Sequence, residues 1–274
     1  MHHQRLSLPL VQLITAVFLY TGLGLAVSLP AAMAERPVET TFDSTDFAGT
    51  VVWDDSNADE RPALLMVPNW MGPTAASLKK AKKVAGMGYV VYMVDMYGVD
   101  VRPQNAEEAS AAATTVRDDR PMMRRRAQHH LATLRGLAED LPIDSNRIGA
   151  IGFCFGGGTV LELARSGAAI GGVVSFHGNL DTPDPAIAEQ IQTAILVCHG
   201  MADPYVPMEQ VTALVDEMET AAVDYQFVGF GQAVHSFTNP QADTPGKSDY
   251  DPQAAQRSFQ YMNSFFKERF GPAQ

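Results

Sequence analysis

The stretch RIGAIGFCFGGGTVLELARSG, residues 147–167, decides the fold class. Residues 147–153 form an apolar run, which predicts a buried strand. Residues 156–167 have helical spacing and end in glycine, which predicts a helix. Cys154 therefore stands where the chain turns from a strand into a helix, with glycines close by on both sides.

The rest of the chain repeats this alternation. Residues 38–55 predict two short strands with a turn at Asp43–Asp46. Further buried strands are expected at 62–70, 89–98, 171–178, 193–200 and 224–230, and helices at 74–88, 105–116, 121–141, 208–222 and 252–270. Such alternation indicates an α/β fold with a mostly parallel central sheet and helices on both faces. Ligands bind beyond the carboxyl ends of the strands in these sheets, so residues that end strands are the candidates for chemistry.

The first 34 residues predict a secretory signal. Arg5 is followed by the apolar run LPLVQLITAVFLYTGLGLAV, and AAMA (31–34) has the small-x-small pattern of a signal-peptidase site. The alternative is an uncleaved membrane anchor, because the run is long enough to span a bilayer if it is tilted. Cleavage would leave residues 35–274 as a single α/β domain, exported to the periplasm or secreted. No second apolar run in the remaining sequence is long enough to cross a membrane.

GFCFG (152–156) has the small-x-nucleophile-x-small pattern of a nucleophile elbow. Flanking glycines permit the close backbone approach that such a sharp turn needs. The positive end of the following helix would lower the pKa of the Cys154 thiol, and the N–H of Phe155 would be one donor to an oxyanion. The alternative is a structural cysteine buried in a glycine-rich junction. The sequence contains no G-x-S-x-G motif, so no serine competes for the role.

Asp203 and His235 follow in the order expected of a catalytic triad. Asp203 lies in HGMADPYVP (199–207), in a loop after a predicted strand, and His235 lies in GQAVHSF (231–237), just after the last strand. Nucleophile, acid and histidine occur in this order in α/β-hydrolases. In such a triad the histidine takes and returns a proton, and the acid fixes the histidine tautomer.

GFCFGG, HGMADPYVP and AVHSFTNP together resemble the dienelactone hydrolase family, cysteine-dependent members of the α/β-hydrolase fold. The resemblance covers about residues 64–266, most of the chain after the predicted signal. It implies that Cys154 is the nucleophile, Asp203 the acid and His235 the base. It also implies that the backbone N–H of Trp70 is the second oxyanion donor.

Two departures from the family bear on activation and on the substrate. Asn69 replaces a glutamate that helps to control ionisation of the thiol, so activation would rest on His235 and the helix dipole. Asn239 replaces one of the arginines that bind the carboxylate of a dienelactone. The other arginine would come from a loosely aligned region that contains Arg117, Arg120 and Arg124–Arg126. We interpret the run 124–126 as a solvated helix face, so a neutral ester, lactone or thioester is expected at least as readily as a dienelactone.

Other residues near the predicted strand ends have two interpretations each. Trp70 and Met71 form either an apolar pocket wall or part of the core. His177 and His199 either line the site or anchor turns through hydrogen bonds to the backbone. The candidate substrate contacts are Asn69, Met71, His177 and Asn239. Neither histidine has a recognisable metal-ligand spacing with Cys154, so no zinc site and no cofactor are implied.

The two cysteines of an exported chain suggest a disulfide between Cys154 and Cys198. The fold argues against it. The strands that end at Phe153 and His177 would be neighbours, and the strand of Cys198 would lie on the far side of the second, two strand spacings from the first. Two strand spacings are about 9.5 Å, whereas bridged Cα atoms lie within about 7 Å. We therefore expect a free thiol at Cys154 and a core residue at Cys198.

The sequence as a whole predicts an exported hydrolase that attacks an ester, lactone or thioester with Cys154 and forms an acyl-enzyme. The partner is a small molecule, because a net charge of −11 would repel the phosphate backbone of a nucleic acid. Two alternatives stay open. One is a non-catalytic ligand-binding protein on the same fold, for which Asn69 is the argument, and the other is a redox or sensing protein with Cys154 as an exposed thiol.

Overall fold

The computed structural model describes residues 33–56 and 58–271. The predicted secretory signal, residues 1–34, lies outside these ranges except for its last two residues, which begin strand β1 (Met33–Phe42). Within the described ranges, no helix is both long enough and apolar enough to cross a membrane.

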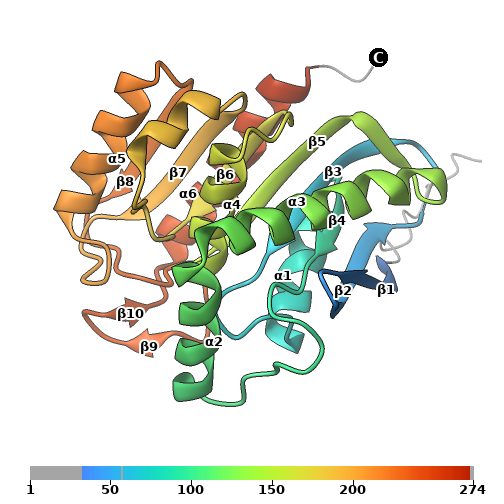
Figure 1. The fold of residues 1–274 in the computed structure, drawn as a ribbon, viewed down its shortest axis with the longest axis horizontal. Helices are drawn as coiled ribbons and strands as arrows, with labels where there is room; N and C mark the ends of the chain where they lie inside the picture. Colours follow the sequence, from blue (N-terminus) through green and yellow to red (C-terminus); the bar gives the residue numbers. More distant parts are fainter. Residues whose placement is uncertain (1–32, 57, 272–274) are drawn as a thin grey trace, which may run out of the picture. The chain divides into compact units, whose positions relative to one another are not determined.

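A sheet of eight strands forms the centre of the described chain, in the order β1-β2-β4-β3-β5-β6-β7-β8 (Figure 1). After β1 the strands are β2 (Thr45–Asp54), β3 (Arg61–Val67), β4 (Val90–Met93), β5 (Ile143–Phe153), β6 (Gly172–Phe176), β7 (Ala194–Gly200) and β8 (Tyr225–Phe230). All neighbouring pairs from β4 to β8 are parallel, whereas β1 and β2 join the edge as an antiparallel hairpin that turns at Asp43 and Ser44. The predicted, mostly parallel α/β sheet is confirmed.

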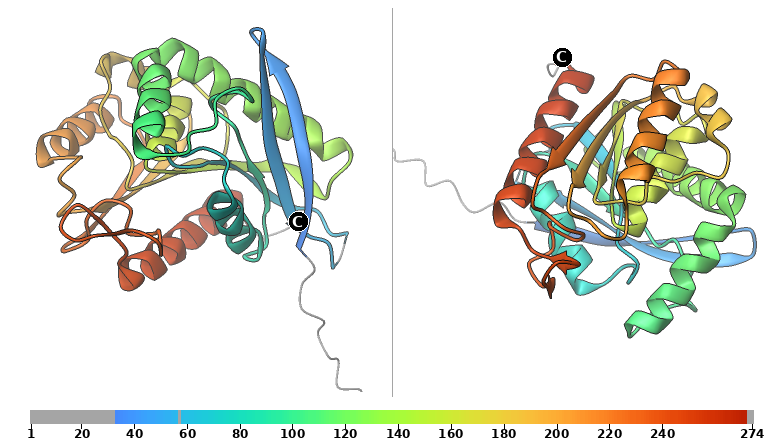
Figure 2. Two further views of the ribbon diagram at one scale, coloured as in Figure 1. Left: turned by 90° about the horizontal axis from the view of Figure 1, so that it is seen from below. Right: turned by 90° about the vertical axis from the view of Figure 1, so that its left-hand side faces the viewer.

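Helices cover both faces of this sheet (Figure 2). One face carries α1 and α6, and the other carries α2, α3, α4 and α5. Their bounds are α1 (Ala75–Ala85), α2 (Ala106–Asp118), α3 (Arg120–Gly136), α4 (Phe155–Arg165), α5 (Met208–Thr220) and α6 (Pro252–Phe270), with short 3₁₀ helices η1 (Leu137–Glu139) and η2 (Pro185–Gln190). Because both faces are covered, the central strands read as continuous apolar runs, and all of β4, β6 and β7 is buried.

Strand β4 is shorter than the apolar run 89–98 predicts, because the chain turns at Asp95. The buried carboxylate of Asp95 accepts hydrogen bonds from the backbone N–H groups of Tyr97 and Gly98 at 3.0 and 3.1 Å. An aspartate that bonds backbone N–H groups just after itself stabilises a turn in place of the strand. This turn carries Tyr97 to the carboxyl edge of the sheet, where its hydroxyl donates to the carbonyl of Trp70 at 2.9 Å.

The arginines at the start of α3 form buried ion pairs. The carboxylate of Glu162, which is fully buried on α4, binds Arg124 at 2.6 Å and Arg120 at 3.5 Å. It also binds Arg165 at 3.0 Å. Arg126 is partly buried and donates to a backbone carbonyl at 2.8 Å. The predicted solvated helix face is therefore wrong for Arg124, because the carboxylate buried on α4 needs cations around it. It is also wrong for Arg126, because the carbonyl of Met96 binds its guanidinium.

Replacing Arg165 with methionine is expected to lower the free energy of unfolding by about 3–5 kcal/mol. The guanidinium of Arg165 is buried and donates to both carboxylate oxygens of Glu217 at 2.7 Å, so its removal leaves that carboxylate buried without its cation. Urea unfolding followed by circular dichroism measures the change. Arg125→Met is the control, because Arg125 is exposed on α3, and its removal should cost less than about 0.5 kcal/mol. Equal stability of Arg165→Met and the wild type would contradict the prediction.

Candidate active site

Cys154 occupies the sharp turn between β5 and α4. Its φ of 56° lies in the left-handed region, where a residue other than glycine is strained by about 1–3 kcal/mol. Glycines on both sides make room for the turn. A Cβ on Gly152 would lie 1.9 Å from the carbonyl oxygen of Gly156, and a Cβ on Gly156 would lie 2.1 Å from that of Val67. The backbone thus has the geometry of a nucleophile elbow at the carboxyl end of a central strand.

The structure brings Cys154, Asp203 and His235 together at this edge of the sheet. Asp203 follows β7 and His235 follows β8, so both come from loops at the carboxyl ends of neighbouring strands. His235 Nδ1 lies 2.7 Å from Asp203 Oδ2, and its Nε2 lies 3.1 Å from the sulfur of Cys154. Asp203 is buried, and its second oxygen accepts the N–H of Tyr205 at 2.8 Å. Both ring nitrogens of His235 are therefore within hydrogen-bond reach of the predicted partners.

The three groups change one another's ionisation. Burial by itself would raise the pKa of the Cys154 thiol, but the hydrogen bond and charge of His235 bring this pKa below its usual value. Burial by itself would lower the pKa of His235, but hydrogen bonds to Asp203 and Cys154 raise it to about 10. These contacts therefore favour a thiolate paired with an imidazolium over the two neutral groups.

Two backbone N–H groups, those of Phe155 and Trp70, converge on the sulfur of Cys154, where each favours the thiolate. Phe155 is the first residue of α4, so its N–H has no partner within the helix. Trp70 lies in the loop after β3, and the hydrogen bond from Tyr97 to its carbonyl fixes its peptide group. The indole of Trp70 is 36% exposed, so this side chain is not part of the core.

A small hairpin holds the segment that carries His235. Its strands are β9 (Asp243–Thr244) and β10 (Ser248–Asp249), and the N–H of Asp249 donates to the carbonyl of His235 at 3.1 Å. The rings of Tyr205 and His177 pack edge-on against the His235 ring, with centroid distances of 5.3 and 5.4 Å. Backbone and ring contacts together fix the imidazole between Asp203 and Cys154.

A cavity of about 770 Å³ lies between α1, α6 and the segment 238–241. This is within the usual range of small-molecule sites, about 300–1,000 Å³. Phe153, which precedes Cys154, and Thr238, three residues after His235, line it, whereas the side chains of the triad do not. Of the four predicted substrate contacts, Asn69, Met71 and Asn239 line this cavity and His177 does not. The side-chain oxygen of Asn69 accepts the N–H of Met71 at 3.2 Å, and that of Asn239 accepts the N–H of Gln241 at 3.1 Å, so both amides are held by local turns. The arginines of α2 and α3 do not line this cavity.

The two histidines at the ends of β6 and β7 differ in their surroundings. His177 is buried, its Nε2 lies 2.8 Å from Thr238 Oγ1, and its ring contacts that of His235. His199 packs on Phe227. The Nδ1 atoms of both histidines have no hydrogen-bond partner among the described residues. His177 therefore contacts the ring of the triad histidine without lining the cavity between α1 and α6.

Sequence reasoning missed Lys80, Tyr97 and Thr238. Lys80 donates to Thr238 Oγ1 at 3.1 Å, and its ammonium lies 4.0 Å from the ring centroid of Phe153. The signal for Lys80 was its helical spacing, because position 80 lies three residues after the buried Ser77 and four before the buried Val84. Tyr97 and Thr238 meet their partners only through the fold and carry no comparable signal.

Both cysteines are free thiols, as predicted. Strand β6 lies between β5 and β7, and Phe176 of β6 is paired with Cys198, so the neighbour order behind that prediction is confirmed. Cys198 is fully buried, and burial raises the pKa of its thiol. Within the described ranges, no group of three or more His, Cys, Asp or Glu side chains is placed to hold a metal ion.

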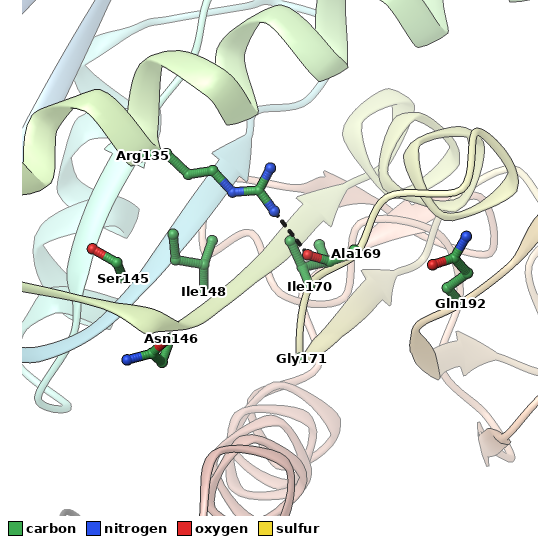
Figure 3. Close-up of a pocket in the computed structure, with 8 residues that line it drawn as sticks. All are labelled: Arg135, Ser145, Asn146, Ile148, Ala169, Ile170, Gly171 and Gln192. Atoms are coloured by element: carbon green, nitrogen blue, oxygen red, sulfur yellow. Dashed lines mark hydrogen bonds between the residues drawn. The ribbon is translucent and has the colours of Figure 1, made fainter.

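A second cavity, of about 240 Å³, lies near the amino ends of β5 and β6 (Figure 3). Its wall includes Asn146, Gly171 and Arg135, whose guanidinium donates to the carbonyl of Ala169 at 2.8 Å. The candidate catalytic residues follow the carboxyl ends of their strands and do not line it. This cavity is therefore separate from the candidate active site.

Comparison with known proteins points to one family. The model of the dienelactone hydrolase family matches residues 47–270. A solved dienelactone hydrolase-like promiscuous phosphotriesterase from metagenomic libraries is 37% identical, with a TM-score of 0.80 over 88% of this chain and all of that one. A probable 2-oxo-3-(5-oxofuran-2-ylidene)propanoate lactonase of Bradyrhizobium is 27% identical over 72% of this chain and 80% of its own length. An uncharacterised protein of Caenorhabditis elegans is 38% identical over 51% of this chain and 90% of its own length.

Proposed function

The chain belongs to the dienelactone hydrolase family, as a hydrolase of ester or lactone bonds, and we propose that it works through a Cys154–His235–Asp203 triad and an acyl-enzyme. The observation that carries this proposal is the continuous series of contacts from Asp203 through His235 to the sulfur of Cys154. The convergence of two backbone N–H groups on the same sulfur supports it.

Acylation would begin from the thiolate–imidazolium pair. The sulfur of Cys154 attacks the carbonyl carbon, and the N–H groups of Phe155 and Trp70 stabilise the oxyanion that forms. As the carbon–oxygen bond to the alcohol breaks, Nε2–H of His235 protonates the leaving oxygen. The products of this step are a thioester on Cys154, a free alcohol and a neutral His235, whose Nδ1–H still donates to Asp203.

Deacylation would reverse these roles with water in place of the alcohol. Neutral His235 takes a proton from water, whose oxygen attacks the thioester carbonyl. The tetrahedral intermediate expels the thiolate of Cys154 and leaves a carboxylic acid. The thiolate–imidazolium pair is restored, and the net reaction consumes one ester or lactone bond and one water molecule.

The charges of the residues that line the cavity between α1 and α6 indicate which class of substrate fits it. Asn239 offers no positive charge to a substrate carboxylate, which favours a neutral ester or lactone. Lys80 and Lys83 of α1 line the same cavity, however, so an anionic group would also meet a cation there. The names of the relatives, a lactonase and a promiscuous phosphotriesterase, extend the classes worth testing to lactones and phosphotriesters. The predicted signal at residues 1–34 adds the proposal that this reaction takes place outside the cytoplasm.

Rapid mixing with 4-nitrophenyl acetate tests the covalent step. We expect a burst of nitrophenolate close to the enzyme concentration, because formation and hydrolysis of the thioester are separate steps. Quenched protein should carry an acetyl group on the peptide that contains Cys154 and none on the peptide that contains Cys198. The mass of unreacted protein from the full-length gene reports whether the chain begins at Glu35. Steady turnover without any adduct on Cys154 would contradict the proposed mechanism.

The same assay, extended to other substrates, addresses specificity. A neutral aryl ester, a neutral lactone, a carboxylate-bearing dienelactone and a phosphotriester should be compared by kcat/KM. A preference for the neutral ester or lactone is expected if Asn239 decides the charge of the substrate, and a preference for the dienelactone if the lysines do. Binding of these compounds without turnover of any would favour the non-catalytic ligand-binding alternative.

A further inference from the structure

Lys80 places a cation behind the candidate nucleophile. It lies on the face of α1 that covers the sheet and is partly buried. Its ammonium sits 4.0 Å from the ring centroid of Phe153, the residue before Cys154, and donates to Thr238 Oγ1 at 3.1 Å. Lys80 belongs to none of the ion pairs of the described residues, although a buried cation is usually paired.

Thr238 connects Lys80 to the residues around His235. An ammonium group has only donors, so Thr238 Oγ1 must accept from charged Lys80. The hydroxyl proton of Thr238 is then free to donate to Nε2 of His177, which lies 2.8 Å away. Thr238 and His177 are 4% and 2% exposed, so this bonded series is enclosed and its geometry is fixed. The ring of His177 contacts that of His235, which joins the series to the site.

We propose that Lys80 is a positioning residue of the active site, held in place by Thr238, whose ammonium favours the thiolate of Cys154. The inference rests on the proposed function, because it assigns Lys80 a role in preparing the nucleophile of that reaction. An opposite charge behind the thiol adds to the effect of His235 and of the two N–H groups.

The charge of Lys80 depends on pH near neutrality. Burial first, and then the charge of the neighbouring Lys83, lower the pKa of Lys80 to about 7, although the charge of Cys154 acts in the opposite direction. The titratable groups that act on it are Lys83 on its own helix, Cys154 from the turn after β5, and His177 at the end of β6. From α6, the apolar ring of Phe259 lies beneath Lys83. Below about pH 7 Lys80 is charged and supports the thiolate, and above that pH the support is withdrawn.

The pH dependence of thiol alkylation tests the proposal without needing a substrate. The rate of iodoacetamide labelling of Cys154 should be measured from pH 4 to 10 in the Cys198→Ala background. The labelling rate rises with pH as the thiol of Cys154 ionises, and we call this rise the acid limb of the profile. Lys80→Met should move the midpoint of the acid limb upward by about one pH unit. Thr238→Val keeps the lysine but removes the hydroxyl that accepts its hydrogen bond, so it should move the midpoint of the acid limb in the same direction by a smaller amount. Lys80→Arg, whose cation persists at all these pH values, should keep the acid limb of the wild type.

Lys79→Met is the matched control, because it removes the same charge from the exposed neighbouring residue of α1. Its labelling profile should coincide with that of the wild type. The inference is overturned if Lys80→Met also coincides with the wild type, or if Lys79→Met shifts the profile as much as Lys80→Met does. Thermal unfolding of each variant confirms that the labelled protein is folded. Failure to find an esterase substrate would affect the proposed function and leave this labelling result intact.

Discussion

Replacing Cys154 with alanine is expected to lower kcat/KM for an aryl ester by about 10⁴-fold or more. The thiolate forms the covalent bond in the proposed reaction, and no other group of the triad can replace it. Removal of the nucleophile from a comparable triad leaves only the catalysis supplied by the oxyanion donors and substrate binding. Hydrolysis of 4-nitrophenyl acetate, corrected for the uncatalysed rate, measures the loss.

Cys198→Ala is the matched control for that variant. Cys198 lies inside β7, fully buried, and is the other cysteine of the chain. Its loss should lower stability by the small amount that a missing core sulfur costs and leave kcat/KM within about twofold of the wild type. Similar activity of Cys154→Ala and Cys198→Ala would contradict the assignment of Cys154 as the nucleophile.

Replacing His235 with alanine is expected to lower kcat/KM by about 10³-fold or more and to change the ionisation of the thiol. Without the imidazole, neither protonation of the leaving alcohol nor activation of water has a donor or acceptor in place. The hydrogen bond and charge that lower the pKa of Cys154 are lost as well. Alkylation of Cys154 should then follow an ordinary thiol, with its midpoint near pH 8.5 or above.

The wild type should differ from His235→Ala in the pH dependence of Cys154 labelling, and its imidazole should stay protonated well above neutral pH. Its thiol pKa is lowered, so labelling should reach its plateau at a lower pH than in His235→Ala. The pKa of His235 is raised to about 10, so the proton needed by the leaving alcohol is retained until the pH approaches that value. His129→Ala is the control, because His129 stacks on Phe42 away from the sheet edge that carries the triad. An unchanged labelling profile in His235→Ala would show that the imidazole does not ionise the thiol.

The order of strands and helices was predictable because each segment carries its own periodicity. Apolar runs marked the buried strands, and helical spacing ending at glycine marked α1 and α4. The junctions carried the chemistry, because a parallel sheet collects the carboxyl ends of its strands at one edge. That rule by itself predicts that Cys154, Asp203 and His235, which follow three different strands, lie at the same edge of the sheet.

The surroundings of the site were not predictable in the same way. Lys80 lies 158 residues from Thr238 in the chain, and nothing local in the helix signals that partner. The solvated interpretation of Arg124 failed for the same reason, because Glu162, its partner, belongs to a different helix. The local sequence of a helix predicts that a charged residue faces solvent, because the element that packs on it and buries it lies elsewhere in the chain.

The sequence by itself determined the α/β class, the turn at Cys154 and the order of the three polar residues that follow successive strands. Those properties depend on local spacing, glycine and the alternation of apolar segments, all of which are written along the chain. Only the tertiary structure decided which charges are buried, how the cavity between α1 and α6 is lined, and which groups shift the pKa of the thiol. The physical reason is that desolvation and hydrogen bonding depend on what packs from other elements, and a residue's place in the sequence does not contain that information.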